Sequence, residues 1–399
     1  MDASSKVTID LNDTAIAFES KSEKELKRTL FLFKIMNKSF LVKVGSQLTL
    51  LALKAKLPIQ GIIKRTVFKQ FCGGTSLRNC LFTIRRLANY QVATVLDYGA
   101  EAKSTEEEFD GAVQEFLKAV RFAAKEEAVP VVTCKVTALA DFDLLEKITA
   151  KRMLRKTETA ALERINNRMH SICKEAQQLG VAIFIDAEES WIQDAIDDLT
   201  NSMMASYNKE RVTVYNTYQM YRHDRLTYLK DSFETARREG YILGAKLVRG
   251  AYMEKERNRA EAKGYPSPIQ PDKASSDKDY NAAVKFCIEN HTQIASCLAT
   301  HNQKSTLYQL ELMQKLGISP RHPHLNFCQL YGMSDNLTFN LAKASFNVAK
   351  YVPYGPIRDV VPYLIRRAQE NIAVKGEVSR ELKLLKKEAQ RRKKRSSSF

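Results

Sequence analysis

The chain has 399 residues and a formal net charge of +17, with 44% hydrophobic and 27% charged residues. This length suits one (β/α)8 barrel with an added segment, and no apolar run approaches the roughly 20 residues that a membrane-spanning helix needs. The seven cysteines are scattered without a CxxC pair, which argues against a disulfide framework or a zinc site and favours reduced thiols.

Residues 1–90 are predicted to form a helical N-terminal extension. Between residues 21 and 70 the sequence has 12 lysines and arginines against 2 glutamates, interleaved with apolar runs such as LFLF and LTLLAL. This pattern is typical either of solvated helix faces or of a segment that contacts a membrane surface. No nucleic-acid partner is predicted, because the segment has no zinc-finger, RRM or KH signature. The first 25 residues lack the pattern of a targeting peptide, so we expect a cytosolic chain or one that has lost a presequence.

Residues 91–376 alternate short β-branched or apolar runs with amphipathic stretches. This alternation is typical of βαβ units and a parallel sheet. We predict helices at residues 106–124, 160–179, 192–208, 227–238, 278–290 and 304–316. We predict strands at residues 93–99, 129–136, 181–188, 211–218, 242–250, 294–302, 324–332 and 346–355. Eight parallel strands with interleaved helices indicate an α/β fold of the (βα)8 barrel class.

Polar or aromatic residues follow the apolar part of seven predicted strands. They are Lys135, Asp186, Asn216 with Tyr218, Lys246 with Arg249, His301 with Asn302, Gln329, and Tyr351. Barrels of this class carry their chemistry at the C-terminal ends of the strands, so these side chains are expected to meet at one mouth. Because cations dominate the set, an anionic ligand is predicted. No GxGxxG, P-loop, HExxH or GxSxG motif occurs, which argues against a Rossmann site, an NTPase, a zinc protease or a serine hydrolase.

The segment after the eighth predicted strand carries an adjacent pair of arginines, Arg366 and Arg367. Its prolines predict a helix that starts near residue 359, with Pro362 no later than the first turn. One face would hold Val361, Leu364, Ile365 and Ala368, and the other Asp359, Tyr363, Arg366, Arg367 and Glu370. Two interpretations remain open: a surface helix with Arg366 paired to Glu370, or a clamp whose guanidinium forks bind a carboxylate.

Residues 377–399 are predicted to be a basic helical and then disordered tail. Between residues 380 and 395 there are 9 lysines and arginines against 2 glutamates, and the chain ends in RRKKRSSSF. Low-complexity composition of this kind is typical of disorder.

Eight segments of the sequence resemble the proline dehydrogenase family, in family order across roughly residues 90–376. They are CKVTAL, IDAEE, YNTYQ, GAKLVRGAYMEKER, GYPSPIQP, ATHN, FCQLYGM and YVPYGPIRDVVPYLIRRAQEN. The resemblance implies a distorted (βα)8 barrel whose last helix lies over the barrel mouth. It also implies FAD-dependent oxidation of L-proline to Δ1-pyrroline-5-carboxylate, with a quinone as electron acceptor and a peripheral membrane contact through the basic N-terminal segment.

The resemblance also implies roles for individual residues. Asp186 and Lys246 would be the catalytic pair, and the proline site would contain Lys135, Leu330, Tyr351, Tyr363, Arg366 and Arg367. The FAD site would contain Ile185, Asn216, Lys246, Arg249, Gly250, Ala251, Thr300, His301 and Asn302. Many family members have Gln at position 216 and Arg at position 246, so the flavin contacts at these two positions are in question. No metal ion is expected.

Two alternatives to proline oxidation stay open. A hydroxyproline dehydrogenase would share the fold, although Tyr351 against the ring leaves little room for a hydroxyl group. A membrane- or nucleic-acid-binding protein would use the barrel only as a scaffold. The expected location is the cytoplasmic side of a bacterial inner membrane, or the mitochondrial matrix and inner membrane if a presequence was removed.

Overall fold

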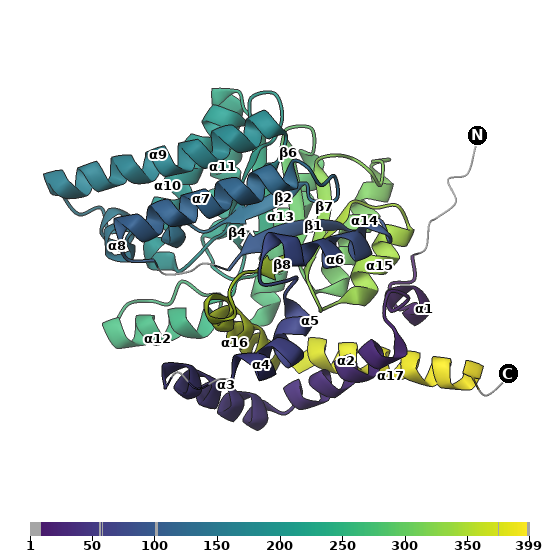
Figure 1. Cartoon of the computed structure of the whole chain (residues 1–399). Coiled ribbons are helices and arrows are strands. Elements are labelled where there is room, and N and C mark those ends of the chain that lie inside the picture. The colour runs from purple at the N-terminus through teal and green to yellow at the C-terminus, as the bar shows by residue number, and fades with distance from the viewer. Residues whose placement is uncertain (1–8, 56, 58, 100–102, 374, 397–399) are drawn as a thin grey trace, which may run out of the picture.

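Eight parallel strands close into a barrel in the computed structural model, which describes residues 9–396 except 56, 58, 100–102 and 374 (Figure 1). Each strand pairs with the next in the sequence, and β8 pairs with β1. The eight strands predicted from the sequence are confirmed, with most ends trimmed by a few residues and β4 extended by one residue to Gln219. They are β1 Ala93–Tyr98, β2 Val131–Cys134, β3 Ala182–Ile185, β4 Val214–Gln219, β5 Leu243–Val248, β6 Ile294–Ala299, β7 Leu325–Leu330 and β8 Val348–Tyr354.

The strands are apolar on both faces because both faces of the closed sheet are buried. One set of alternate residues fills the barrel interior, including Val95, Phe184, Tyr215, Cys297 and Tyr351. The other set packs against the surrounding helices in the largest core. Residue parity along each strand therefore decides whether a side chain can reach the barrel mouth.

The helices predicted between the strands are also present. They are α7 Glu106–Ala123, α9 Lys156–Leu179, α10 Ser190–Tyr207, α11 Arg225–Glu239, α13 Lys273–Glu289 and α14 Gln303–Lys315. Gly180 and Gly240 end α9 and α11 in the left-handed conformation, at φ 76° and 68°, as helix-stopping glycines do. The sequence analysis did not predict α8 Phe142–Thr149, α12 Met253–Lys263 or α15 Asp335–Lys343. In α12 the reason is its composition, since the segment MEKERNRAEAK has almost no apolar periodicity.

The N-terminal helices form a second core with the last two helices of the chain. They are α1 Thr14–Ala17, α2 Glu23–Met36, α3 Ser39–Lys54, α4 Gln60–Ile63, the π-helical turn Lys64–Phe68 and α5 Lys69–Phe71, whereas α6 Leu77–Ala88 packs against the barrel in the largest core. Phe33, Phe68 and Phe71 pack there against Val361 and Leu385. Figure 1 shows α2, α3 and α17 together on one side of the barrel, with α16 between α3 and the barrel.

Helix α16, Ile357–Ala373, corrects the predicted start near residue 359. The amides of Asp359 and Val360 already bond to the carbonyl of Pro356, at 2.9 and 3.2 Å. Pro362 consequently lies in the second turn, where it removes one backbone hydrogen bond. The exposed ring is tolerated because the neighbouring Val361 and Leu364 are buried in the second core. The side chains of Ala368 and Glu370, and so the alternative Arg366–Glu370 pair, lie outside the described residues.

The C-terminal helix α17, Lys375–Ser396, is folded where the sequence analysis predicted disorder from residue 391. Glu381, Leu384, Leu385 and Glu388 recur on one side of the helix and are at most 7% exposed. Glu388 bonds Arg391 and Arg392 within the last turns. These i, i+3 and i+4 spacings give the basic segment an apolar and ion-paired stripe that packs against α2.

We expect Leu385→Ala to lower the free energy of unfolding by about 2–5 kcal/mol, because it empties a fully buried site in the second core. Urea denaturation measures the change. Lys383→Ala, an exposed position on the same helix, is the control and should leave stability within about 0.5 kcal/mol. Equal stability of the two variants would mean that Leu385 is not packed in the second core.

Candidate active site

Asp186 is the centre of a buried charged cluster at the C-terminal mouth of the barrel. Its Oδ1 bonds the Nζ of Lys246 on β5, and its Oδ2 accepts a 2.6 Å hydrogen bond from the hydroxyl of Tyr351 on β8. The Nζ of Lys135, just after β2, lies 3.8 Å from the same Oδ2. The four side chains belong to residues at most 9% exposed. Four predicted site residues, contributed by four strands, are thus brought together.

The lysines keep the Asp186 carboxylate ionised. Burial raises the pKa of Asp186, but the charges of Lys246 and Lys135 and the hydrogen bonds from Lys246 and Tyr351 outweigh burial and lower the pKa overall. Burial, followed by the charge of Asp186, raises the pKa of Tyr351, so its hydroxyl stays protonated as a donor. The Lys246 ammonium also lies 5.4 Å from the ring centroid of Phe184 and 5.6 Å from that of Tyr351, a favourable position for a cation.

Asp97 on β1 extends the cluster, and the sequence analysis missed it. Its Oδ1 accepts hydrogen bonds from the hydroxyl of Thr133, at 2.8 Å, and from the Nζ of Lys135, at 3.4 Å. Lys135 therefore lies between two carboxylates, which fixes the direction of its ammonium group. The signal was available, because Asp97 is a charged residue near the end of the first predicted strand, the one strand that the survey of strand ends left out.

Glu188 and Gln219 form a second polar group at the mouth, also missed. Gln219 ends β4 with the same parity as the interior residue Tyr215. Its Nε2 donates to the backbone carbonyl of Glu188 at 2.9 Å, while its buried Oε1 has no hydrogen-bond partner within the described part of the chain. The Glu188 carboxylate accepts hydrogen bonds from the amide and hydroxyl of Thr137, at 3.1 and 2.6 Å. The free oxygen of Gln219 is an acceptor ready for a ligand donor.

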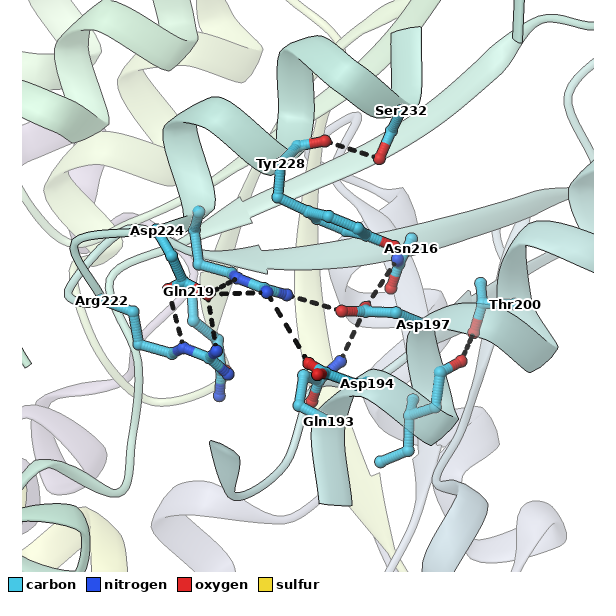
Figure 2. Close-up of polar contacts among 12 residues, drawn as sticks. Gln193, Asp194, Asp197, Thr200, Asn216, Gln219, Arg222, Asp224, Tyr228 and Ser232 are labelled. Atoms are coloured by element: carbon cyan, nitrogen blue, oxygen red, sulfur yellow. Dashed lines mark hydrogen bonds and ion pairs between the residues drawn. The ribbon is translucent and has the colours of Figure 1, made fainter. Parts of the chain in front are cut away.

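Asn216 does not reach the mouth. It has the opposite parity to Gln219 on β4, and its Nδ2 donates to Asp197 Oδ1 at 2.9 Å (Figure 2). Asp197, on α10, also accepts from Gln193 at 2.9 Å and forms an ion pair with Arg225 at 2.5 Å. The structure thus gives Asn216 a place in the network that fastens α10 and α11 to the outside of β4.

Ile185 likewise points its side chain out of the barrel. It is 1% exposed and belongs to the core between the strands and the helices. Only its main chain faces the cluster, and its carbonyl accepts a 2.6 Å hydrogen bond from the Thr217 hydroxyl.

Arg249, Thr300 and Asn302 form one linked group at the ends of β5 and β6. Arg249 donates from Nη1 to the Thr300 hydroxyl and from Nε to Asp277, both at 2.8 Å, and its guanidinium lies 4.2 Å from the ring centroid of Tyr280. Thr300 Oγ1 also accepts from the Asn302 amide at 3.1 Å, and Asn302 caps α14. These hydrogen bonds place three of the predicted cofactor residues next to one another.

Gly250 and Ala251 lie in the turn that follows this arginine. Gly250 has φ 136°, and a Cβ there would lie 2.3 Å from a ring carbon of Tyr221. Both the backbone angle and the close approach require glycine. Ala251 is partly exposed beside it, so the turn presents a backbone surface with little side chain.

Helix α16 lies over this mouth. The Arg366 guanidinium is 5.9 Å from the ring centroid of Tyr252, which follows β5, and that of Arg367 is 5.2 Å from the ring of Tyr363. Burial, then the charges of Lys350, Arg367, Arg380 and Arg249, lowers the pKa of His301 to about 3. Arg367 is therefore near the β6 end as well as on α16. Leu330, at the end of β7, packs against both the barrel interior and the second core, and so connects α16 to Tyr351.

Comparison with known proteins identifies the chain. The family model "Proline dehydrogenase" matches residues 80–380. Proline dehydrogenase 1 of Dictyostelium discoideum is 33% identical, with 95% of this chain and 74% of that protein aligned, and hydroxyproline dehydrogenase of Xenopus laevis is 31% identical, with 94% and 88% aligned. The chain belongs to the proline dehydrogenase family. It is accordingly an oxidoreductase of the class that acts on the CH–NH group of proline.

Solved structures of proline dehydrogenase relatives share the fold. The proline utilization A of Bdellovibrio bacteriovorus, in a crystal structure of the protein inactivated by N-propargylglycine, superposes with a TM-score of 0.71 at 21% identity. The match covers 90% of this chain and 38% of that chain, so this proline dehydrogenase chain spans well under half of the larger protein. The likeness supports the distorted barrel with its last helix over the mouth.

The buried Glu188 predicts a specific pH dependence of stability. Burial, partly offset by the bonds from Thr137, raises its pKa to about 7 from an ordinary 4.5. A raised carboxyl pKa favours the protonated folded state, so stability is full below pH 4.5 and falls as the pH rises towards 7. Between pH 5 and pH 8 the unfolding free energy of Glu188→Gln, measured by urea titration, should fall less than that of the parent. Glu127→Gln, at an exposed position, should leave the profile unchanged; a shift of the same size in both would contradict the assignment.

Proposed function

We propose that this protein is an FAD-dependent proline dehydrogenase that oxidises L-proline to Δ1-pyrroline-5-carboxylate and passes the electrons to a quinone. The observation that carries the proposal is the enclosure of Asp186 by Lys246, Lys135 and Tyr351, under a helix that carries Arg366 and Arg367. Such a mouth offers cations for one carboxylate and a shielded space for the ring beside it.

The proline carboxylate would be bound by Arg366 and Arg367, with Lys135 as a third cation. Paired guanidinium forks suit a carboxylate because each can form two parallel hydrogen bonds. The pyrrolidine ring would pack between Tyr351, Tyr363 and Leu330, which meet at the junction of the barrel interior and the second core. Fixing the carboxylate at two or three points orients the ring, and such positioning supplies a large part of the rate.

FAD would lie along the mouth from β4 to β6, held by Lys246, Arg249, Gly250, Ala251, Thr300, His301 and Asn302. The residues present fit a flavin. The unpartnered Gln219 Oε1 can accept from a ring N–H, the required Gly250 allows close backbone approach, and the basic residues suit a pyrophosphate. Gln219 takes the place in the proposal that the outward-facing Asn216 does not fill, and Ile185 can contribute only its main chain.

The flavin would supply hydride acceptance, and the protein would prepare the substrate for it. The lysines and arginines around the site favour loss of the proton from the substrate's ammonium group, which leaves a lone pair to assist departure of the C5 hydride. Asp186 would orient Lys246 and Tyr351 through its two oxygens, and α16 would limit access of water from above.

A flavin spectrum with and without proline tests the proposal. The purified protein should be yellow, and anaerobic addition of L-proline should bleach the flavin absorbance. A protein that takes up no FAD on reconstitution would overturn the proposal. Such an outcome would favour the alternative in which the barrel is a scaffold for membrane or nucleic-acid binding.

Hydroxyproline is the second candidate substrate, because one relative of similar identity is named hydroxyproline dehydrogenase. The Tyr351 hydroxyl, fixed on Asp186 at 2.6 Å, leaves little room for a further hydroxyl on the ring. We therefore favour proline. Comparison of kcat/KM for the two amino acids decides the question, and a higher value for hydroxyproline would reverse the assignment.

A membrane contact is proposed for α2, α3 and α4. Phe31, Phe40, Leu48, Leu51 and Ile62 are 60–74% exposed on these helices, and exposed basic residues lie among them: Lys24, Lys27, Lys34, Lys38, Lys64 and Arg65. Apolar and basic groups on one surface are typical of peripheral binding to acidic lipid. None of the helices in the described ranges is both long and apolar enough to cross a bilayer.

Binding to lipid vesicles tests this contact. Vesicles rich in phosphatidylglycerol should bind the protein, and neutral phosphatidylcholine vesicles should bind it weakly. The triple variant Phe40→Ser, Leu48→Ser, Leu51→Ser should lose binding and keep activity with a soluble acceptor. Unchanged binding of this variant would contradict the proposal. The relevant membrane would be a bacterial inner membrane or, because two of the relatives are named mitochondrial, the mitochondrial inner membrane.

A further inference from the structure

We propose that the C-terminal helix α17 is part of the candidate cofactor site, with Arg380 and Glu381 as positioning residues that hold the His301 segment in place. This inference rests on the proposed FAD site, which includes Thr300, His301 and Asn302. It extends the site by about 80 residues in sequence, to a segment whose composition predicted a tail.

Arg380 acts on the main chain of the segment. Its Nη2 donates a 2.7 Å hydrogen bond to the backbone carbonyl of His301. A charge-assisted bond to a carbonyl fixes the position of a loop more strongly than a neutral one. The loop between β6 and α14 thus has one of its carbonyls tied to a helix more than 75 residues later in the chain.

Glu381 acts on the His301 ring through Ser334. Its Oε2 accepts a 3.2 Å hydrogen bond from the Ser334 amide, and the Ser334 hydroxyl lies 2.9 Å from His301 Nδ1. Ser334 has φ 50°, a left-handed conformation that is uncommon for a serine and needs support from its surroundings. Ser334 and Glu381 are 3% and 5% exposed, so the chain of contacts is shielded from water.

Helix α17 is held in place by the second core and by the segment that contains Phe18 and Lys21. Leu384 and Leu385 are buried in the second core. Arg392 donates to the carbonyls of Phe18 and Lys21 at 2.7 and 2.8 Å. Lys21 in turn pairs with Asp335 at 3.1 Å, directly after Ser334 in the sequence. The N-terminal segment, α17 and the Ser334 turn therefore form one closed set of contacts around the His301 segment.

Among the described residues Glu381 forms no direct ion pair, but charges of both signs lie around it. Burial, then the charge of Asp335, raises its pKa to about 7, while Lys350, Arg380 and Lys21 act in the opposite direction. Lys350 is occupied by Asp335 at 2.9 Å. An acceptor at position 381 is therefore needed for the Ser334 amide, whether or not it carries a charge, and glutamine can replace it.

The test compares the Kd for FAD of the parent and the variants. Each protein is stripped of flavin or refolded without it, and the quenching of FAD fluorescence on binding gives the Kd. We expect Glu381→Ala and Arg380→Ala to raise the Kd for FAD about tenfold, with KM for proline unchanged at saturating FAD. Glu381→Gln should restore the parental Kd within about twofold, because its amide oxygen accepts the same bond.

Leu385→Ala is the matched control, because it weakens the packing of α17 without touching Ser334 or His301. If Leu385→Ala raises the Kd as much as Glu381→Ala at equal loss of stability, the two polar residues act only through the fold and the inference is overturned. It is also overturned if Glu381→Ala and Arg380→Ala bind FAD like the parent. A parent protein that binds no FAD would instead refute the proposed function itself.

Discussion

Lys246→Met is expected to destabilise the protein by about 3–5 kcal/mol, because it leaves the carboxylate of Asp186 buried without its principal cation. Lys246 and Asp186 are 5% and 9% exposed and bonded directly. Asp186→Asn should cost a comparable amount, since it leaves the ammonium of Lys246 facing Lys135 with less negative charge between them. Urea denaturation at pH 7 measures both.

The double variant Asp186→Asn with Lys246→Met measures the interaction energy between the two charged side chains separately from the cost of burying each one. With both charges removed, no unpaired charge stays buried. We expect the double variant to lose less unfolding free energy than the two single variants lose in sum, by about 2 kcal/mol or more. Additive losses would mean that the two side chains are independent. Because the pKa of Asp186 is lowered in the fold, this contribution is present above the ordinary pKa of 3.8 and is lost as the pH falls below it.

Arg367→Lys is expected to raise KM for proline about tenfold while FAD stays bound, because lysine keeps the charge but loses the bidentate fork. The change corresponds to about 1.4 kcal/mol of binding free energy. Steady-state kinetics with a soluble acceptor gives KM, and the flavin absorbance per chain gives occupancy.

Arg358→Lys is the matched control on the same helix, at an exposed position, and should leave KM unchanged. If Arg367→Lys also left KM unchanged, the buried Arg367 would not bind the proline carboxylate, and the proposed clamp would be wrong. A fall in flavin content with an unchanged KM would instead assign Arg367 to the cofactor.

The barrel could be predicted from the sequence because its signals are local. Each strand is a short apolar run, and Gly180 and Gly240 end helices at the expected places. Of the helices that were missed, α12 lacks such signals, whereas α8 has them in its Asp141 cap and its buried Leu144 and Leu145. The segment of α12 is almost uniformly polar, and it is held by contacts distant in sequence: Glu256 accepts hydrogen bonds from the Ser190 amide and hydroxyl, and Arg259 pairs with Glu146.

The sequence predicted which strand ends meet at the candidate site, but not which way each side chain points. Lys135, Asp186, Lys246 and Tyr351 were predicted to meet, and their side chains do lie in one cluster. The placement of Asn216 could not be read from its position, because one residue of register decides whether a β4 side chain faces the mouth or the helices. Gln219, three residues later, has the inward parity.

The helical order of residues 391–396 was not predicted because the stabilising partners of α17 are distant in sequence. Composition counts the charges of residues 380–395 but not the stripe of Leu384, Leu385 and Glu388 that α2 and the second core bury. A basic segment of this kind is disordered alone and ordered when the complementary surface is present. Only the folded barrel and the N-terminal helices together supply that surface.

The adjacency of α2 and α17 in Figure 1 also orders the biosynthesis of the protein. Helix α2 is synthesised long before α17, the helix that packs on it. Domains tend to fold from the N-terminus as the chain emerges, but here α2 must wait for α17. The second core, and with it the turn that supports His301, can therefore close only after α17 has been synthesised.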